Sequence, residues 1–590
     1  MPVDLKSEEA MPRNHKIAIW EAVAFIFLMW LYYSFLKPST TTFVVIGILV
    51  FILFIFIHMG LSYTGEKSKL YGLKPIVDRL PVIKKPEAHI PFNRKMLWLI
   101  VILLFYFVLT NVMIYGLDPV ESIDLFASWR AILAGAQGSV LHLGIGPIVT
   151  GSIIMQLFVG AKIINLNLKD KEDKAVYQST QKLIVIIMIF VEAIPQVYGY
   201  LQPAKGFVSA LDGYSKGNGQ LIAQSLIVAQ IAFGSYLVFL MDEVVSKWAI
   251  GSGISLFIAA GVAQAIFTGT FNWLPTSPTK ALSFDNPPAG TIPKTIYFVQ
   301  NMNAANLAGG GFEQIFLQNP NPIIAIIGTL VIFLVVAYVE STKIELPLAH
   351  SKARGARGRY PIRLMYASNI PVILMSAVLA NVAMFSLLLW NHPVLSTWPG
   401  IGHQTWIGSY PTKDVAEQLG ISVTTPMDGI AYYLSSINGV HEWFLPLINP
   451  DRYGGLMRGR EYWQVLLHVI LYVGAMVVGS ILFAKFWIET TNMDAESVAK
   501  QIESSGMLIP GFRRDPRVLR LVLQRYIPQI TIISGAAVGA LAAIADMIGT
   551  VGNASGTGLL LTVGILINLY EAMGREQLME MHPALRQFFS

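Results

Sequence analysis

Residues 124–150 read DLFASWRAILAGAQGSVLHLGIGPIVT, and this stretch decides how the rest of the chain is interpreted. Its first part, Asp124 to Gly138, is apolar enough to leave water but too short to cross a bilayer, and it carries Arg130. It runs into Gly144-Ile145-Gly146-Pro147, where a longer apolar run begins. Backbone that stops partway through a membrane is tolerated only inside protein or beside an aqueous cavity. The stretch predicts either a half-helix in a funnel-shaped vestibule or an interfacial helix on the outer surface, and the residues alone do not decide between them.

The composition around this stretch is that of a membrane protein. The 590 residues are 54% hydrophobic and only 13% charged, which is far from the balance of a soluble domain. The chain has no cysteine, which excludes disulfides, thiolate metal sites and cysteine nucleophiles. His441-Glu442 lacks the second histidine of a zinc-protease helix, and no Gly-rich phosphate loop ending in Lys-Ser or Lys-Thr occurs. We therefore expect no catalysis, no cofactor and no metal site.

Roughly twelve apolar runs approach or exceed the length needed to span a bilayer as a helix, which is about 20 residues. The first two form a transmembrane hairpin that we assign to residues 1–66. The twelve expected spans are 17–36, 42–59, 96–116, 143–163, 181–200, 221–241, 252–271, 322–340, 369–390, 463–486, 526–547 and 556–573.

The basic residues predict the orientation. With the N-terminus in the cytoplasm, about 32 of the 42 Lys and Arg residues fall on the cytoplasmic side, as the positive-inside rule describes. The C-terminus and the loops at 341–364 and 489–524 then also lie in the cytoplasm. Two long connections, 272–321 and 391–461, lie outside, and their Gly, Pro, Asn and aromatic residues are more typical of ordered caps than of disorder.

Few ionisable residues lie within the expected spans, and the main ones are Glu21, Glu192 and Asp546. Each should face protein or water, because a charge is expensive in lipid. Glu192, Thr150 and Asn381 have two interpretations. They hold helices together through hydrogen bonds, or they take part in transport, and the sequence leaves both open.

Two arginine-rich clusters lie on the expected cytoplasmic side, within 352–363 and 513–520. Retention charge explains such clusters, but glycines between the arginines of the first predict a projecting flexible tip. Guanidinium groups also suit phosphate, so docking on ribosomal RNA or an acidic protein surface is the second interpretation. The expected docking residues are Arg354, Arg357, Arg359, Arg363, Arg513, Arg514 and Arg517.

Five motifs in a fixed order resemble the SecY family, the channel-forming alpha subunits of the Sec translocon, of the archaeal and eukaryotic type. They are KPEAHIPF at 85–92, WRAILAG at 129–135, LGIGPIVT at 143–150, WAIGSGISLFI at 248–258 and RGRYPI at 357–362. The resemblance implies an all-α polytopic membrane protein with a ten-helix core, built as two inverted halves of five helices around an hourglass pore. The halves would be residues 67–271 and 322–590, joined by the loop at 272–321. The hairpin at 1–66 is an addition to the family pattern.

The resemblance also assigns site residues. The pore ring would be Ile145, Val149, Ile254, Ile258, Ile373 and Leu561. The plug would be residues 124–138, with Leu125, Phe126, Trp129, Arg130, Ile132 and Leu133 as its main side chains. Thr150, Glu192 and Asn381 would lie at a lateral gate. A ring of aliphatic side chains offers ions no replacement for their hydration, yet it yields around a passing polypeptide.

The function implied by the family is passive movement of unfolded polypeptides across the cytoplasmic membrane and lateral insertion of apolar helices into it. The implied partners are two small single-span subunits, of the SecE (gamma) and beta types, the translating ribosome, signal sequences and nascent chains. A secondary solute transporter also has inverted repeats and broken helices. The scarcity of charges within the spans favours the channel over the transporter. A membrane-embedded enzyme comes third, since no catalytic pair is evident.

Overall fold

The computed structural model describes residue 70, residues 83–87, 90–118 and 130–160, and most of 164–581. Within 164–581 the undescribed positions are 165, 167–169, 200, 216, 277–280, 285, 304–309, 319, 351–356, 364–369, 392–401, 413, 417–420, 449, 454–456, 458–459, 492, 505–506 and 509–515. The expected hairpin at 1–66 lies outside the described residues.

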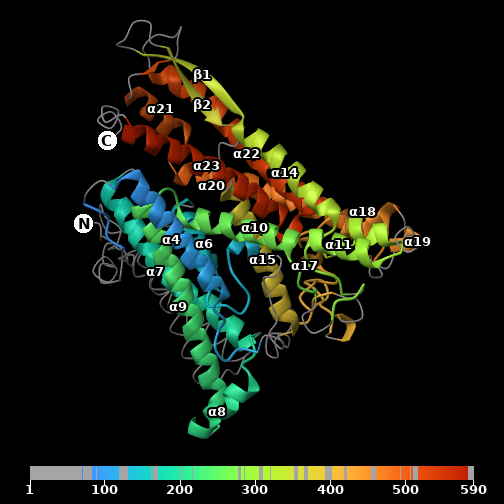
Figure 1. The fold of residues 1–590 in the computed structure, drawn as a ribbon. Coiled ribbons are helices and arrows are strands. Elements are labelled where there is room, and N and C mark those ends of the chain that lie inside the picture. Colours follow the sequence, from blue (N-terminus) through green and yellow to red (C-terminus); the bar gives the residue numbers. More distant parts are fainter. Residues whose placement is uncertain are drawn as a thin grey trace, which may run out of the picture.

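Long helices form the core in two sets (Figure 1). The first set is α4 (Phe92–Asn111), α6 (Gly146–Gly160), α7 (Lys171–Gly199), α9 (Gly219–Trp248) and α10 (Gly253–Phe271). The second set is α14 (Ile323–Ser341), α15 (Ile370–Asn391), α20 (Tyr462–Thr490), α22 (Pro516–Ile548) and α23 (Gly556–Met581). Within the described part of the chain, 9 of these helices are long and apolar enough to cross a membrane. The predicted helical, polytopic membrane fold is confirmed.

Helix α6 is shorter than the span expected at 143–163, with 15 residues from Gly146 to Gly160. The chain turns before it, because Gly144 has a φ of +57° and the Ile145 N–H donates to the Leu133 carbonyl at 2.8 Å. A Cβ atom at Gly144 would lie 2.1 Å from that same carbonyl oxygen, so only glycine fits here. The segment before α6 therefore folds back onto α5 (Arg130–Leu133).

The helices run between two faces of the molecule. We call one the loop face, because it carries the connections 272–321 and 391–461, and the other the sheet face, because it carries the strands. Helix α14 runs from the loop face to the sheet face, whereas α4, at the same place in the first set, runs the opposite way (Figure 1). The helices at the other equivalent places also run in opposite directions, as two inverted halves require. These pairs are α6 and α15, α7 and α20, α9 and α22, and α10 and α23.

The sheet face carries a small antiparallel sheet with the strand order β2-β1-β3. Strand β1 (Lys343–His350) pairs with β2 (Arg357–Arg363) and, through its last two residues, with β3 (Met507–Leu508). Residues 357–363 were expected to belong to a flexible basic tip, and they form β2 instead. The backbone of β1 supplies them with regular hydrogen-bond partners, so the glycines do not prevent an extended conformation. The helical core therefore carries a short sheet that the sequence did not predict.

Short helices cover the loop face. They are α8 (Lys205–Ser215), α11 (Thr291–Asn301), α13 (Phe312–Phe316), α17 (Ile430–Tyr433), α18 (Val440–Ile448) and α19 (Pro450–Tyr453). Helix α18 packs against α20 and α22, and α11 packs against α10. Both long connections thus contain ordered elements that contact the core, as their composition suggested. On the sheet face, α21 (Ala495–Ser504) packs against α22.

The two sets of helices meet along two seams. Helix α10 packs against α23 at the first, and α6 packs against α20 at the second. At the first seam the backbones touch, since a Cβ atom at Gly269 would lie 2.4 Å from the Gly552 Cα atom in η6 (Val551–Asn553). One hydrophobic cluster extends through both sets. The main core of the molecule therefore lies between the halves and is shared by them.

Candidate functional site

The six residues expected to form the pore ring come from α10, α15, α23 and the start of α6. The side chains of Ile145, Ile258 and Leu561 are each 1% exposed and belong to the shared hydrophobic cluster. The other three are partly buried and pack against the same cluster; they are Val149, Ile254 and Ile373. Many further residues belong to this cluster, so the choice of these six as the ring stays a prediction.

The segment expected to form the plug is described from Arg130 onward. Its residues Leu125, Phe126 and Trp129 lie outside the described residues, as does the side chain of Ile132. Helix α5 packs against α10 and α23, the helices that carry Ile254, Ile258 and Leu561. Leu133, at the end of α5, is partly buried. The described end of the segment therefore contacts two helices that carry expected ring residues.

The buried side chains of His142 and Gln196 hold this segment in place. Arg130 donates a hydrogen bond to the His142 carbonyl. The Gly138 N–H donates to His142 Nδ1 at 3.2 Å, so Nε2 carries the ring proton and donates to Gln196 Oε1 at 3.1 Å. His142 and Gln196 are 2% and 4% exposed. The sequence analysis missed both residues, and the only available signal was a single histidine inside an apolar run.

Thr150 and Glu192 meet between α6 and α7. The Thr150 Oγ1 atom lies 2.7 Å from Glu192 Oε1 and 2.8 Å from the Gly146 carbonyl oxygen. A hydroxyl has one proton and donates to only one of these acceptors at a time. Gly146 leaves room for the carboxyl, because a Cβ atom there would lie 3.0 Å from Glu192 Oε2. Among the described residues, the Glu192 carboxyl is thus held by one hydroxyl group, which it shares with the backbone.

Asn381, the third expected gate residue, lies on α15 and is partly buried. In the part of the chain that the structure describes, it forms no hydrogen bond with Thr150 or Glu192. Helix α20 packs against both α15 and α6. A further polar contact that the sequence did not predict joins α6 and α7, where Gln181 Nε2 donates to Ser152 Oγ at 2.7 Å. The structure brings two of the three expected gate residues together and leaves the third apart.

Asp546, near the end of α22, carries a buried carboxyl and is only 3% exposed. Its Oδ2 atom accepts from the Tyr472 hydroxyl at 2.7 Å and from the Thr557 hydroxyl at 3.2 Å. Its Oδ1 atom accepts from the Gly556 N–H at 2.5 Å, and the Thr557 N–H lies 3.4 Å away. These N–H groups belong to the first residues of α23 and have no partner within that helix. Asp546 therefore fastens α20, α22 and α23 together.

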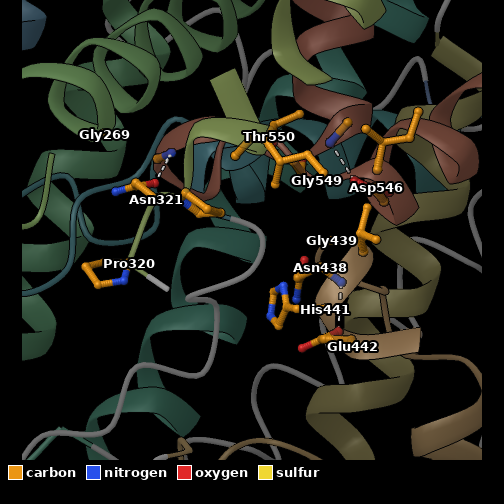
Figure 2. A pocket seen from close by; sticks show the side chains of 18 of the residues that line it. Gly269, Pro320, Asn321, Asn438, Gly439, His441, Glu442, Asp546, Gly549 and Thr550 are labelled. Atoms are coloured by element: carbon orange, nitrogen blue, oxygen red, sulfur yellow. Dashed lines mark hydrogen bonds between the residues drawn. The ribbon is translucent and has the colours of Figure 1, made fainter. Parts of the chain in front are cut away.

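A cavity of about 500 Å³ lies on the loop face beside Asp546 (Figure 2). Its walls come from α10, α14, α18 and the turn between α22 and α23. Asn321 lies on one side, where its Oδ1 atom accepts from the Gly552 N–H at 2.8 Å. On the other side Glu442 Oε2 accepts from the Asn438 N–H at 2.8 Å. None of the six expected ring residues lines this cavity.

Four of the seven expected docking arginines have a described backbone, and they lie on or near the sheet face. Residues Arg357, Arg359 and Arg363 belong to β2, and Arg517 belongs to α22. Their side chains are not among the described ones, and the other three arginines of the set lie outside the described residues; these are Arg354, Arg513 and Arg514. Close to them, Arg520 donates to Glu496 Oε2 at 3.1 Å on the surface. The structure thus places part of both clusters by their backbone alone.

Comparison with known families covers most of the described chain. A family profile described as SecY matches residues 139–570, and one described as the plug domain of Sec61p matches residues 104–138. The protein translocase subunit SecY of Archaeoglobus fulgidus is 44% identical over 521 residues, which is 88% of this chain and 98% of that relative. The SecY subunit of Haloferax volcanii is 42% identical over 520 residues, with the same shares of 88% and 98%.

Solved structures show the same fold. A protein-conducting channel is similar with a TM-score of 0.64 and 37% identity, covering 87% of this chain and 99% of that one. Sec61 in a canine ribosome–channel complex from the endoplasmic reticulum gives a TM-score of 0.62 at 37% identity, with the same shares of 87% and 99%. The plug-domain match includes residues 124–138, the short apolar segment with which the sequence analysis began.

Proposed function

We propose that six aliphatic side chains close the pore of this chain at rest. The proposal starts from the fact that the chain belongs to the SecY family and forms the protein-conducting channel of a translocase. The family consists of protein-conducting channels and not of enzymes. The similar proteins named above are translocase subunits and channels, so they do not favour a solute transporter. The observation that supports the ring is that all six residues lie in or against one apolar cluster between the halves. They are Ile145, Val149, Ile254, Ile258, Ile373 and Leu561.

The chemistry of these residues suits a seal that must also open. Aliphatic side chains cannot replace the hydration shell of an ion, so a narrow ring of them excludes ions. They make no directional bonds, so they separate around a threaded polypeptide of any sequence. We further propose that residues 124–138 are the plug, which closes the funnel on the loop face and moves aside when a substrate enters. The packing of α5 against α10 and α23 supports this position.

The contact between Thr150 and Glu192 is the proposed weak point of a lateral gate. It lies on α6 and α7, beside the seam where α6 meets α20. This bond joins α6 to α7, and among the described residues neither side chain forms a hydrogen bond across the seam to α20 or α15. The pair therefore does not oppose separation of α6 and α7 from α20 and α15. An apolar signal sequence that occupies the open seam would then bias the equilibrium toward the open state. Asn381 on α15 would complete the polar set from the other side.

Partners and orientation follow as parts of the same proposal. Small single-span subunits of the SecE (gamma) and beta types and the translating ribosome would complete the assembly, and a similar Sec61 was solved in a ribosome–channel complex. Strand β2 and the start of α22 carry docking arginines on the sheet face, which we assign to the cytoplasm together with both termini. The loop face would then lie outside the cytoplasmic membrane.

A conductance measurement tests the ring. The double variant Ile254→Gly, Ile258→Gly should let ions leak through the resting channel, reconstituted in planar bilayers with its co-purifying subunits. The matched control is Leu330→Gly, Leu334→Gly on α14, where both side chains are 60% exposed and have the same spacing. Equal resting conductance in the two double variants would show that Ile254 and Ile258 do not form the seal. Translocation of a secretory precursor serves as the second readout, because it reports that the variant channel still assembles.

A further inference from the structure

Helix α11 exposes aliphatic side chains and buries its charged one, which is the reverse of a helix that faces water. Its sequence is TIPKTIYFVQN, and Lys294 is its one charged residue. Lys294 is 1% exposed, whereas Ile292 and Val299 are 40% and 57% exposed, and Ile296 between them is partly exposed. Residues 292, 296 and 299 share one face of a helix. The outward face of α11 is therefore aliphatic and its inward face holds the charge.

The inward position of Lys294 is built into the surrounding loop. Its Nζ atom donates to the Gln318 carbonyl at 2.7 Å and to the Pro320 carbonyl at 3.0 Å. Burial lowers the pKa of Lys294 to about 8, in agreement with an amine that water does not reach freely. A lysine on a surface helix ordinarily extends its amine into water. Here the amine is fixed on the protein side, so α11 cannot simply rotate to hide its aliphatic face.

The start of α11 is bonded to the last turns of α10, a membrane-spanning helix. The Gly290 N–H donates to the Asn272 carbonyl at 2.8 Å, and the Thr291 hydroxyl donates to the Gly269 carbonyl at 3.3 Å. Gly269 lies within the span Gly253–Phe271. The first residue of α11 is therefore at the depth of the last turn of the span, and Figure 1 shows α11 beside that end of α10.

The apolar surface at this depth continues from α10 onto the connection that leads to α11. Phe267 and Phe271 on α10 are 65% and 49% exposed, and Trp273 and Leu274 immediately after it are 61% and 69% exposed. The Ala289 N–H donates to the Leu274 carbonyl at 2.9 Å, which brings the start of α11 to this surface. Exposed aromatic residues at the end of a span are typical of the zone where acyl chains meet head groups. The start of α11 thus adjoins an exposed apolar surface of the kind that suits contact with lipid.

Helix α8 provides the contrast, because it has the same length and lies on the same face. Both helices have 11 residues. Among the described side chains of α8, the exposed residues are Lys205, Gly206, Ser209, Ala210 and Gly213, and none of them is a large apolar residue. Two short helices of one face therefore expose opposite kinds of side chain, and only α11 exposes an aliphatic one along its length.

We propose that α11 lies in the bilayer interface on the loop face, with Ile292, Ile296 and Val299 in contact with acyl chains. The loop at 272–321 then joins the membrane at this helix and does not stand wholly in water above the pore. The apolar face needs an apolar environment, the buried Lys294 fixes its direction, and the bonds to α10 fix its depth. Amphipathic helices with an aliphatic face bind the interfacial zone of bilayers in this way.

Spin-label accessibility tests the proposal, and a chain with no cysteine allows labelling at one chosen site. The variants are Ile292→Cys and Val299→Cys on α11, with Ser209→Cys on α8 as the matched control. Each full-length variant is labelled with a nitroxide and reconstituted in lipid vesicles with its co-purifying subunits. Collision rates are then measured with oxygen, which concentrates in lipid, and with a water-soluble nickel chelate. We expect the ratio of oxygen to nickel collisions to be several-fold higher at residues 292 and 299 than at residue 209.

Two results would overturn the proposal. Nickel collisions at residues 292 and 299 as frequent as at residue 209 would mean that α11 faces water. Infrequent collisions with both reagents would mean that a partner protein or a second copy of the chain covers the helix. All three positions are exposed, so the labels replace side chains that the fold does not need for packing. The result does not depend on the identity of the pore ring, because it is measured on the resting chain.

Discussion

Two carboxyl groups within the membrane-spanning helices, those of Glu192 and Asp546, are held in opposite ways. Asp546 accepts from two hydroxyl groups and from N–H groups at the start of α23 that have no acceptor within their own helix. Glu192 has one hydroxyl group near it, from Thr150, which also has the Gly146 carbonyl as an acceptor. Asp546 joins three helices of one half, whereas Glu192 lies beside the seam where α6 of one half meets α20 of the other. Of these two carboxyl groups, the one within a half is strongly bonded and the one beside a seam is weakly bonded, which suits a molecule whose halves must separate.

The largest effect should come from removing the strongly bonded carboxyl. Asp546→Ala leaves the Tyr472 hydroxyl and the first N–H groups of α23 buried without an acceptor, so we expect a loss of about 3 kcal/mol or more in stability. Thermal unfolding of the purified complex in detergent measures this loss. Glu192→Ala is the control, with a clearly smaller loss. Equal losses would mean that the two carboxyl groups do not differ as described.

A smaller loss should follow when one donor is removed and the carboxyl is kept. Tyr472→Phe deletes a single hydroxyl group from a side chain that is 0% exposed and leaves the other bonds of Asp546 in place. We expect a loss of about 1 kcal/mol. The same thermal assay checks it. A loss as large as that of Asp546→Ala would show that Tyr472 alone carries the contact between α20 and α22.

The buried amine of Lys294 on the loop face can be compared with the two carboxyl groups. The pKa of Lys294 is lowered by burial from 10.5 to about 8. Between these two values the unfolded chain binds more protons than the folded one, so stability should rise with pH across this window, by about 1 kcal/mol per pH unit. The measurement is the melting temperature of the native chain relative to Lys294→Met at several pH values. A difference between the two that stays constant from pH 8 to pH 10 would contradict the buried position of Lys294.

The smallest change in stability should come from the weakly bonded site, where we expect the change to appear in function. Thr150→Val keeps the shape of the side chain and removes the hydroxyl group, so the stability loss should stay below about 1 kcal/mol. If Thr150 and Glu192 form the proposed polar seam, the more apolar double variant Thr150→Val, Glu192→Leu should pack its gate more tightly and translocate a secretory precursor more slowly. Thr268→Val on α10 is the control, because the hydroxyl group of this exposed residue bonds to carbonyl groups of its own helix. Unchanged rates in the double variant would remove the seam from the gate proposal.

The sequence predicted the spans well because each is a long apolar run, and such runs carry their own signal. It predicted α6 less well, because the late start of that helix depends on the turn at Gly144 and on the bond from Ile145 to Leu133, which are tertiary features. The strand over 357–363 was missed for a related reason. Its pairing with β1 is decided by a neighbouring segment, and a cluster of arginines and glycines does not reveal a partner.

The site was predictable in its residue types but not in its contacts. The family resemblance indicated Ile145, Ile258 and Leu561, and all three lie in one buried cluster. Nothing in the sequence indicated that His142 and Gln196 hold the segment after Arg130, since a lone histidine in an apolar run is equally often a simple packing residue. The exposed aliphatic face of α11 was equally hidden. Which face of that helix is buried depends on two carbonyl groups of a distant part of the loop.

The small sheet has a mechanical consequence for the molecule. Strand β1 continues from α14, and β2 and β3 precede α15 and α22 in the chain, so strands next to three helices form one hydrogen-bonded unit. The register from Lys343 opposite Arg363 to Ala349 opposite Arg357 places many bonds side by side, and these resist shear together. A force applied to one strand is therefore shared by the strands paired with it, which adjoin α14, α15 and α22 along the chain.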